Sequence, residues 1–492
     1  MALGTRDGGV SRFSVKYGSA TRWRESSVAD QWELPNGNTD PKALPLACAQ
    51  YNADPSSYSE DCLSAILYVP SSVMDLSGAP TFVWMHGGSF MYGSATNPGL
   101  DGAALSKASR SIVAVVQYRL GALGFMAPSG ITNLAVKDIL TCLQFLAKVL
   151  PSFGGDPSKI TVAGQSSGAN MARALLATPF ASSYFRSAIL QSDPMDYGFL
   201  TQSMQSTLQA HFNSMLNCTS TSTNTSCLEA IPLSTVLDIS FRYASEAVTI
   251  QVPATSAEPM RPVNDGSFIT STLDSSMPFP RVSKPILLST VKNEAGPTIY
   301  GNFPSPMGSN AFANLINKAY EQPRARNLLQ SPYYNLAEGD DARVPLERLG
   351  TDAVWRCAIW TFARSWAANG GRAFVAEYAL GATYPDNVNV SFCSEEAAVC
   401  HEDDIEIVFG TVPNPTVAQT ALVNEVQARY SAFMHTGEPS PQDGGYPAWN
   451  PATSSDTNAI LLGGEDNATI GACEVGFWGT DAVPYDYQVF HI

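Results

Sequence analysis

Residues 161–170, TVAGQSSGAN, constrain the fold most, because they read as a buried strand, a sharp turn and a helix in direct succession. The residues before the turn, 159–163, are β-branched and apolar, and those after it, 169–176, are strong helix formers. The turn GQSSG fits G-x-S-x-G, which holds a serine at a strand end between two small residues. A phosphate-binding loop is the alternative, but no Lys-Ser/Thr pair follows at the spacing it needs. The pattern therefore predicts that Ser166 is a nucleophile.

Further strand-like runs alternate with helical stretches along the chain. Residues 134–146 have the pattern of an amphipathic helix. This alternation predicts an α/β protein with a mostly parallel central sheet flanked by helices, and ligands bind such sheets at the carboxyl ends of the strands, where Ser166 would lie. We expect a single domain over residues 1–492, with helical cap insertions at 201–280 and 300–350. The predicted strands are residues 81–85, 112–117, 160–163, 188–191, 285–291 and 372–378.

A nucleophilic serine needs a histidine that takes its proton and an acid that orients the histidine. In chains with this turn the order is serine, acid, histidine, which excludes His86. His211 precedes any well-placed acid and is expected to be exposed, His435 stands near a predicted helix end, and His491 is next to the last residue. His401 remains, directly after a short loop between two cysteines.

The acid and the oxyanion donors are sought at strand ends. Glu294 follows the predicted strand 285–291, where a carboxylate is well placed to accept the second imidazole N–H. Residues 86–90, HGGSF, follow the predicted strand 81–85 and resemble the glycine loop that aims backbone N–H groups at a substrate oxygen. Ser167, at the start of the helix after the turn, is a further N–H donor.

Charge and hydropathy exclude several classes of partner. The net charge of −16 argues against nucleic acid and anionic membrane surfaces. We find no uncharged apolar run of eighteen residues, so no transmembrane segment is expected. The first residues, MALGTRDGGVSRF, contain no apolar segment of signal-peptide type. The oligomeric state does not follow from the sequence.

The nine cysteines favour an oxidising, extracellular setting. Three pairs flank short loops and are predicted to form disulfides: Cys48 with Cys62, Cys218 with Cys227, and Cys393 with Cys400. Cys142 and Cys357 stand in apolar helical patterns and are expected to be buried free thiols, while Cys473 has no assigned role. N-glycosylation sequons begin at Asn217, Asn224, Asn389 and Asn467, about as many as chance gives.

Taken together, these motifs resemble the type-B carboxylesterase/lipase family. Residues 153–168 are similar to the serine signature of that family at every defined position, and residues 60–63 resemble its second signature. Residues 118–125, 262–266 and 401–410 are also similar, so the resemblance covers most of the chain from about Tyr17 to Trp449.

The resemblance implies an α/β-hydrolase fold and a triad of Ser166, Glu294 and His401. It implies an oxyanion hole from the N–H groups of Gly88, Ser89 and Ser167, and it matches the pairs Cys48–Cys62 and Cys218–Cys227. The implied activity is that of a serine carboxylic-ester hydrolase that forms an acyl-enzyme on a small-molecule ester and needs no metal or cofactor.

Ser64 and Ala65, after the second signature, depart from the family pattern, and three further departures bear on the site and the sheet edge. Ser89 stands where glycine is usual, so its backbone angle is expected to differ. The acid lies in Asn-Glu-Ala-Gly rather than Asp-Glu-Gly. The first strands expected before Tyr17 are missing, so we expect an incomplete sheet edge.

The loop between Cys48 and Cys62 bears on the substrate. It is short and polar, whereas related fungal lipases carry a long lid there, which favours soluble short- to medium-chain esters. A lipase or sterol esterase acting at a lipid interface is the first alternative. A non-catalytic binding protein of cholinesterase type is the second.

Overall fold

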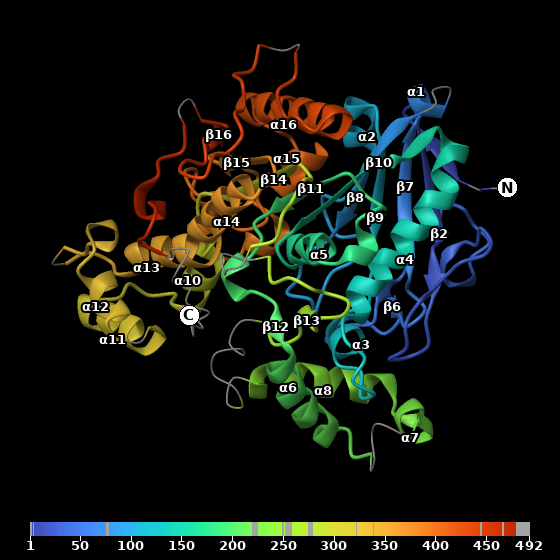
Figure 1. Ribbon diagram of the computed structural model, residues 1–492, viewed down its shortest axis with the longest axis horizontal. Helices are drawn as coiled ribbons and strands as arrows, with labels where there is room; N and C mark the ends of the chain where they lie inside the picture. The colour runs from blue at the N-terminus through green and yellow to red at the C-terminus, as the bar shows by residue number, and fades with distance from the viewer. Residues whose placement is uncertain are drawn as a thin grey trace. The chain divides into compact units, whose positions relative to one another are not determined.

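The computed structural model describes residue 2 and residues 4–74, 78–218, 225–247, 250, 258–273, 279–320, 322–337, 339–442, 445–464 and 467–478. Contacts divide the chain into two compact units. The first unit comprises residues 1–190, 199–272 and 427–446, and the second comprises 191–198, 273–426 and 447–492. Whether the chain folds as one domain stays a prediction. Figure 1 shows the course of the chain.

The first unit contains a sheet with the strand order β1-β2-β7-β9-β8-β10-β11. Strand β9 pairs in parallel with β8, and β8 in parallel with β10, so that Val83 lies opposite both Ala114 and Val162. Every residue of β8 and β9 is buried, as expected for strands covered on both faces. The strands are β1 (Thr5–Asp7), β2 (Val10–Lys16), β7 (Ser64–Pro70), β8 (Ala79–Met85), β9 (Ile112–Val116), β10 (Gly155–Gln165) and β11 (Ser187–Gln191).

The N-terminal edge of this sheet corrects a prediction. We expected no strands before Tyr17, but β1 and β2 lie there and form an antiparallel hairpin. Strand β2 then pairs with β7 from Val10 opposite Pro70 to Lys16 opposite Ser64. Polar residues interrupt the apolar alternation of β2, and this concealed the strand in the sequence.

Helices of the first unit pack on this sheet and beside it. Helix α5 starts directly after β10 and packs against it, and α6 packs against α8 (Figure 1). The helices are α1 (Ser71–Met74), α2 (Ala103–Ser109), α3 (Gly121–Phe125), α4 (Leu134–Val149), α5 (Ser167–Leu176), α6 (Gln202–Met215), α7 (Thr225–Ala230) and α8 (Leu233–Glu246). Short two-residue strands complete the unit: β3 (Gly18–Ser19), β4 (Ser27–Val28), β5 (Ala47–Cys48), β6 (Tyr58–Ser59), β12 (Leu200–Thr201) and β13 (Val263–Asn264).

The second unit contains the parallel strands β14 (Ile286–Val291), β15 (Ala373–Tyr378) and β16 (Ile460–Leu462). Helix α14 packs against β14 and β15. The helices are α10 (Gly296–Asn302), α11 (Ser309–Ala319), α12 (Arg324–Leu329), α13 (Arg343–Gly350), α14 (Cys357–Ala368), α15 (Ile405–Phe409) and α16 (Val417–Thr436), the last of which has residues in both units.

The six strands predicted from the sequence are all present, and helix α4 contains the predicted helix. The segments 201–280 and 300–350 are largely helical where they are described. Their role as a cap stays a prediction. Among the described helices, none is long and apolar enough to span a membrane.

Three of the disulfides confirm predicted pairs, and a fourth was not predicted. Cys48–Cys62, Cys218–Cys227 and Cys393–Cys400 are formed, and Cys142 is a buried free thiol, as predicted. Cys357 was predicted to be free, but it is bonded to Cys473. These two cysteines are 116 residues apart, so no short-loop rule relates them.

Candidate active site

Ser166 occupies the strained turn between β10 and α5. Its φ of 57° and ψ of −128° lie outside the regions that non-glycine residues ordinarily adopt, a strain typical of functional turns. Glycine is required on both sides. A Cβ on Gly164 would lie 2.3 Å from the carbonyl carbon of Gly168, and one on Gly168 would lie 2.1 Å from the Met85 carbonyl oxygen. Close packing of α5 against the end of β8 therefore forces the serine into this conformation.

The predicted oxyanion loop follows β8 and turns with left-handed backbone angles. Gly88 has φ 112° and its carbonyl accepts hydrogen bonds from the N–H groups of Met91 and Tyr92, each at 2.9 Å. A Cβ on Gly88 would lie 2.3 Å from the Tyr92 carbonyl oxygen. Ser89 has φ 52°, so the serine takes a left-handed conformation that glycine adopts without cost.

His86 opens this loop but is a structural residue. Its ring is buried and stacked on Tyr118 at 4.7 Å, and its Nδ1 donates to the Gly87 carbonyl at 2.8 Å. The Tyr118 hydroxyl donates to the His86 carbonyl at 2.6 Å. Burial lowers the pKa of His86 to about 4, so this imidazole is neutral at pH 7 and holds the loop in place.

Glu294 and His401 form a close carboxylate–imidazole pair in the second unit. His401 Nδ1 donates to Glu294 Oε2 at 2.5 Å, and the other carboxylate oxygen accepts from the Val291 N–H at 2.9 Å. The carboxylate of Glu294 is fully buried, whereas 18% of the His401 side chain is exposed. Because Nδ1 contacts Glu294, Nε2 is the ring nitrogen that can accept a proton from a nucleophile, as a general base must.

The negative charges around His401 raise its pKa. Burial has the largest effect and lowers the pKa of His401, but the adjacent Glu294 carboxylate, supported by Glu402 and Asp404, outweighs it and raises the pKa to about 9. The imidazolium form is thus stabilised.

The backbone around His401 is tied to the segment that carries Glu294. Cys400 forms a parallel bridge with Asn293, and the Asn293 N–H donates to the Val399 carbonyl at 2.8 Å. The Asn387 side chain donates to the His401 carbonyl at 2.7 Å. Since Cys400 is also bonded to Cys393, the histidine loop has little freedom.

Asp403 and Asp404, two of the acids after His401, are buried, which the sequence did not indicate. Asp403 accepts hydrogen bonds from the backbone N–H groups of Tyr384 and Cys400, at 2.8 and 2.7 Å. Asp404 is fully buried and accepts from the Gln191 side chain at 2.5 Å. Burial raises the pKa of Asp403 to about 6 and that of Asp404 to about 7. These two residues position the loop, and their place beside His401 was the one signal for them in the sequence.

Trp355 is a further residue that sequence patterns missed. Its ring lies 5.5 Å from that of His401, centroid to centroid. It stands 46 residues earlier in the chain, and no motif relates the two positions.

The remaining histidines fill other roles. His435 lies in the last turn of helix α16 and donates through Nε2 to the Ser109 carbonyl at 3.1 Å, as expected of a structural residue. His211 was expected to be exposed but is half-buried, with Nε2 at 3.2 Å from Glu246. His491 lies outside the described residues. Ser166 and the oxyanion loop belong to the first unit and the Glu294–His401 pair to the second, so their union in one triad stays a prediction.

Comparison with solved structures identifies the fold. A structure entitled PNB esterase matches 93% of this chain and 93% of its own, with a TM-score of 0.74 and 20% sequence identity. The chain therefore has the α/β-hydrolase fold, as predicted.

Comparison of sequences identifies the family. The chain is 29% identical over 317 residues to the cAMP-regulated D2 protein of Dictyostelium discoideum, covering 62% of this chain and 56% of that protein. It is 31% identical over 204 residues to para-nitrobenzyl esterase of Bacillus subtilis (strain 168), covering 38% and 41%. These alignments thus span about half of each curated relative. The model of the carboxylesterase family matches residues 8–478, nearly the whole sequence. The chain belongs to the carboxylesterase family.

Proposed function

We propose that this protein is a serine carboxylic-ester hydrolase. The observation that carries the proposal is the 2.5 Å contact between the His401 imidazole and the buried Glu294 carboxylate. The strained backbone of Ser166 also supports the proposal, because a turn of this kind presents the nucleophilic hydroxyl to a substrate. The name of one relative, para-nitrobenzyl esterase, points to the same reaction class.

In the first half of the proposed reaction, Ser166 Oγ attacks the ester carbonyl while Nε2 of His401 takes the hydroxyl proton. The carbonyl oxygen becomes an oxyanion, which accepts hydrogen bonds from the N–H groups of Gly88, Ser89 and Ser167. Glu294 keeps the proton of His401 on Nδ1 and stabilises the imidazolium. His401 then gives its proton to the leaving alcohol, and an acyl-enzyme forms on Ser166.

In the second half, His401 takes a proton from water, and the hydroxide attacks the acyl carbonyl. The same three N–H groups stabilise the second oxyanion, and the proton returns to Ser166 as the acid leaves. We propose that Ser166, Glu294 and His401 are the residues that carry out this chemistry, and no step requires a metal or cofactor.

The loop between Cys48 and Cys62 supports a soluble substrate. The short strand β5, at the start of this loop, pairs with β6 near its other end, Ala47 opposite Tyr58 and Cys48 opposite Ser59. Its residues between 52 and 57 are mostly exposed and polar. A lid for a lipid interface needs an apolar face, which this loop lacks. We therefore propose short- to medium-chain esters as substrates.

A series of p-nitrophenyl esters from acetate to palmitate tests the function and the substrate together. We expect the largest kcat/KM with short and medium acyl chains and no increase when the substrate forms an interface. Protein inactivated with a fluorophosphonate is the control for spontaneous hydrolysis. Preference for long chains with interfacial activation would identify a lipase, and no turnover of any ester would favour a non-catalytic binding protein.

The oxyanion loop gives a separate prediction. Gly88→Ala is expected to lower kcat/KM by roughly 10²–10³, because its Cβ cannot fit beside the Tyr92 carbonyl and the loop N–H groups must move. Gly130→Ala is the matched control. Gly130 also has a positive φ, 78°, but nothing lies within 4 Å of its added Cβ. Steady-state kinetics with p-nitrophenyl acetate measure both. Equal losses in the two variants would show that backbone strain, and not the loop geometry, causes the effect.

Secretion is also a proposal. Four disulfides among the described residues support an oxidising compartment, since such bonds are rare in the cytosol of most organisms. Glycosylation at the sequons stays a prediction, and Asn224 lies outside the described residues.

A further inference from the structure

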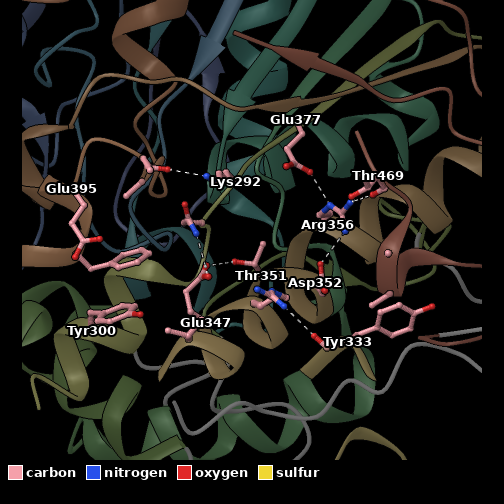
Figure 2. A pocket seen from close by; sticks show the side chains of 18 of the residues that line it. Lys292, Tyr300, Tyr333, Glu347, Thr351, Asp352, Arg356, Glu377, Glu395 and Thr469 are labelled. Carbon is pink, nitrogen blue, oxygen red and sulfur yellow. Dashed lines mark hydrogen bonds and ion pairs between the residues drawn. The ribbon is translucent and has the colours of Figure 1, made fainter. Parts of the chain in front are cut away.

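A cavity of about 580 Å³ lies within the second unit, a size typical of small-ligand sites. Figure 2 shows its lining, with Glu347, Thr351 and Lys292 near the middle. Tyr300 lies toward one side, where its ring stacks on that of Phe392 at 4.1 Å. The proposed chemistry uses none of these residues.

Glu347 is a buried carboxylate in this lining. Its two oxygens accept from the Thr351 hydroxyl at 2.8 Å and from the Asn293 amide at 3.2 Å, which are both neutral groups. Burial, with a smaller contribution from the nearby Asp352, raises the pKa of Glu347 to about 7, although both hydrogen bonds and the charge of Arg348 act in the opposite direction. Among the described residues no cation forms an ion pair with it. A buried carboxylate without an ion-pair partner is stabilised by a cation that enters the cavity.

Two cations of the same lining retain unused donors. Lys292 is exposed and its Nζ donates to the Ala397 carbonyl at 3.0 Å. Arg348 is exposed and its Nη1 donates to the Tyr333 carbonyl at 3.3 Å. An ammonium has three N–H groups and a guanidinium five, so both side chains have donors left for an anion.

The other charged groups of the lining are paired or exposed. Arg356 binds Asp352 at 3.2 Å and Glu377 at 2.8 Å. Glu395 is exposed at the edge of the cavity. The groups that stand ready for a ligand are therefore one buried carboxylate and two cations.

We propose that this cavity is a binding site for a small zwitterion of the amino-acid type, whose ammonium binds Glu347 and whose carboxylate binds Lys292 and Arg348. The stacked rings of Tyr300 and Phe392 favour a ligand with an apolar or aromatic side chain. The ligand is distinct from the ester substrate, and the site functions whether or not the protein hydrolyses esters.

Hydrogen bonds connect this site to the segment that carries Glu294. Glu347 binds the Asn293 side chain, and Thr351 both donates to Glu347 and accepts from the Ala295 N–H at 3.0 Å. Asn293 and Ala295 flank Glu294 on its two sides. A ligand on Glu347 would therefore lie one or two hydrogen bonds from the residues that flank Glu294 in the chain.

Calorimetric titration of the Ser166→Ala protein tests the site without any turnover. The probes are L-phenylalanine, N-acetyl-L-phenylalanine, which lacks the cation, and L-phenylalanine amide, which lacks the carboxylate. We expect L-phenylalanine to bind about tenfold or more tightly than either blocked form, because each form loses a charge-assisted contact. Equal binding of the three probes, or no binding of L-phenylalanine at concentrations on the order of 10 mM, would overturn the proposal.

Variants in the same background assign each half of the ligand. Glu347→Gln is expected to weaken L-phenylalanine by about tenfold and to remove its advantage over the N-acetyl form. Lys292→Met is expected to reduce the difference in binding between L-phenylalanine and L-phenylalanine amide. Since Lys292 is exposed, this variant tests the site even if Glu347→Gln does not fold. Glu229→Gln, an exposed glutamate of helix α7 in the first unit, is the matched control and should leave binding unchanged. Unchanged binding in both folded cavity variants would show that the ligand lies elsewhere.

Discussion

Replacement of Ser166 by alanine is expected to lower kcat for p-nitrophenyl acetate by about 10⁶-fold, the loss typical of a missing catalytic nucleophile. Without Oγ no acyl-enzyme forms, and the remaining hydrogen-bond donors give only slow hydrolysis by water. Alanine at φ 57° carries a strain similar to that of serine, so the turn is expected to keep its shape. The measurement is kcat, with a fluorophosphonate labelling assay on the same samples.

Ser167→Ala is the control for this variant. It removes a neighbouring buried hydroxyl, but it keeps the backbone N–H proposed for the oxyanion. We expect nearly full activity and full labelling. A Ser166→Ala protein that still hydrolyses ester and binds the phosphonate would exclude Ser166 as the nucleophile, whereas an inactive wild type would point to a non-catalytic role.

The fold was predicted well where local chemistry determines it. The runs that became β8, β9, β10 and β14 are β-branched and apolar because both faces of these strands are covered, and such runs are visible without any knowledge of their neighbours. Ser166 was found for a similar reason, since its turn requires small residues at fixed positions.

Features that depend on distant residues were not visible in the sequence. Cys357 and Cys473 come together across 116 residues, and no local pattern marks either partner. Asp404 is buried against Gln191, more than two hundred residues away in the chain, and no local pattern marks that contact. The Glu347 cavity belongs to the same class, because helices and loops from separate segments form its lining.

Replacement of Glu294 by glutamine is expected to lower kcat by about 10⁴-fold while leaving the backbone around it in place. The amide keeps an oxygen for the Val291 N–H, so the local hydrogen bond survives. Its NH₂ group, however, donates to Nδ1 of His401 and moves the imidazole proton to Nε2. That tautomer cannot take the proton of Ser166, and no carboxylate balances the charge that forms on the ring.

The pH dependence of kcat/KM distinguishes this role from a merely structural one, because it reports the titration of the free enzyme. Only neutral His401 accepts a proton, and its pKa is raised to about 9, so the wild-type kcat/KM should rise with pH through a midpoint well above 6.5. In Glu294→Gln the main group that raises the pKa is gone and burial still lowers it, so the midpoint should fall to 6.5 or below.

Glu402→Gln provides the matched control for the pH effect. Glu402 raises the pKa of His401 by charge and forms no hydrogen bond with the ring among the described contacts, so its removal should lower the midpoint by less and leave the high-pH kcat close to that of wild type. If Glu294→Gln and Glu402→Gln shifted the midpoint equally and both kept their kcat, Glu294 would be one of several nearby charges and not the residue that orients His401. A large loss of kcat confined to Glu294→Gln would instead require direct contact with the imidazole during the reaction, since Glu402→Gln also removes a nearby charge but leaves the hydrogen bond that fixes the imidazole tautomer.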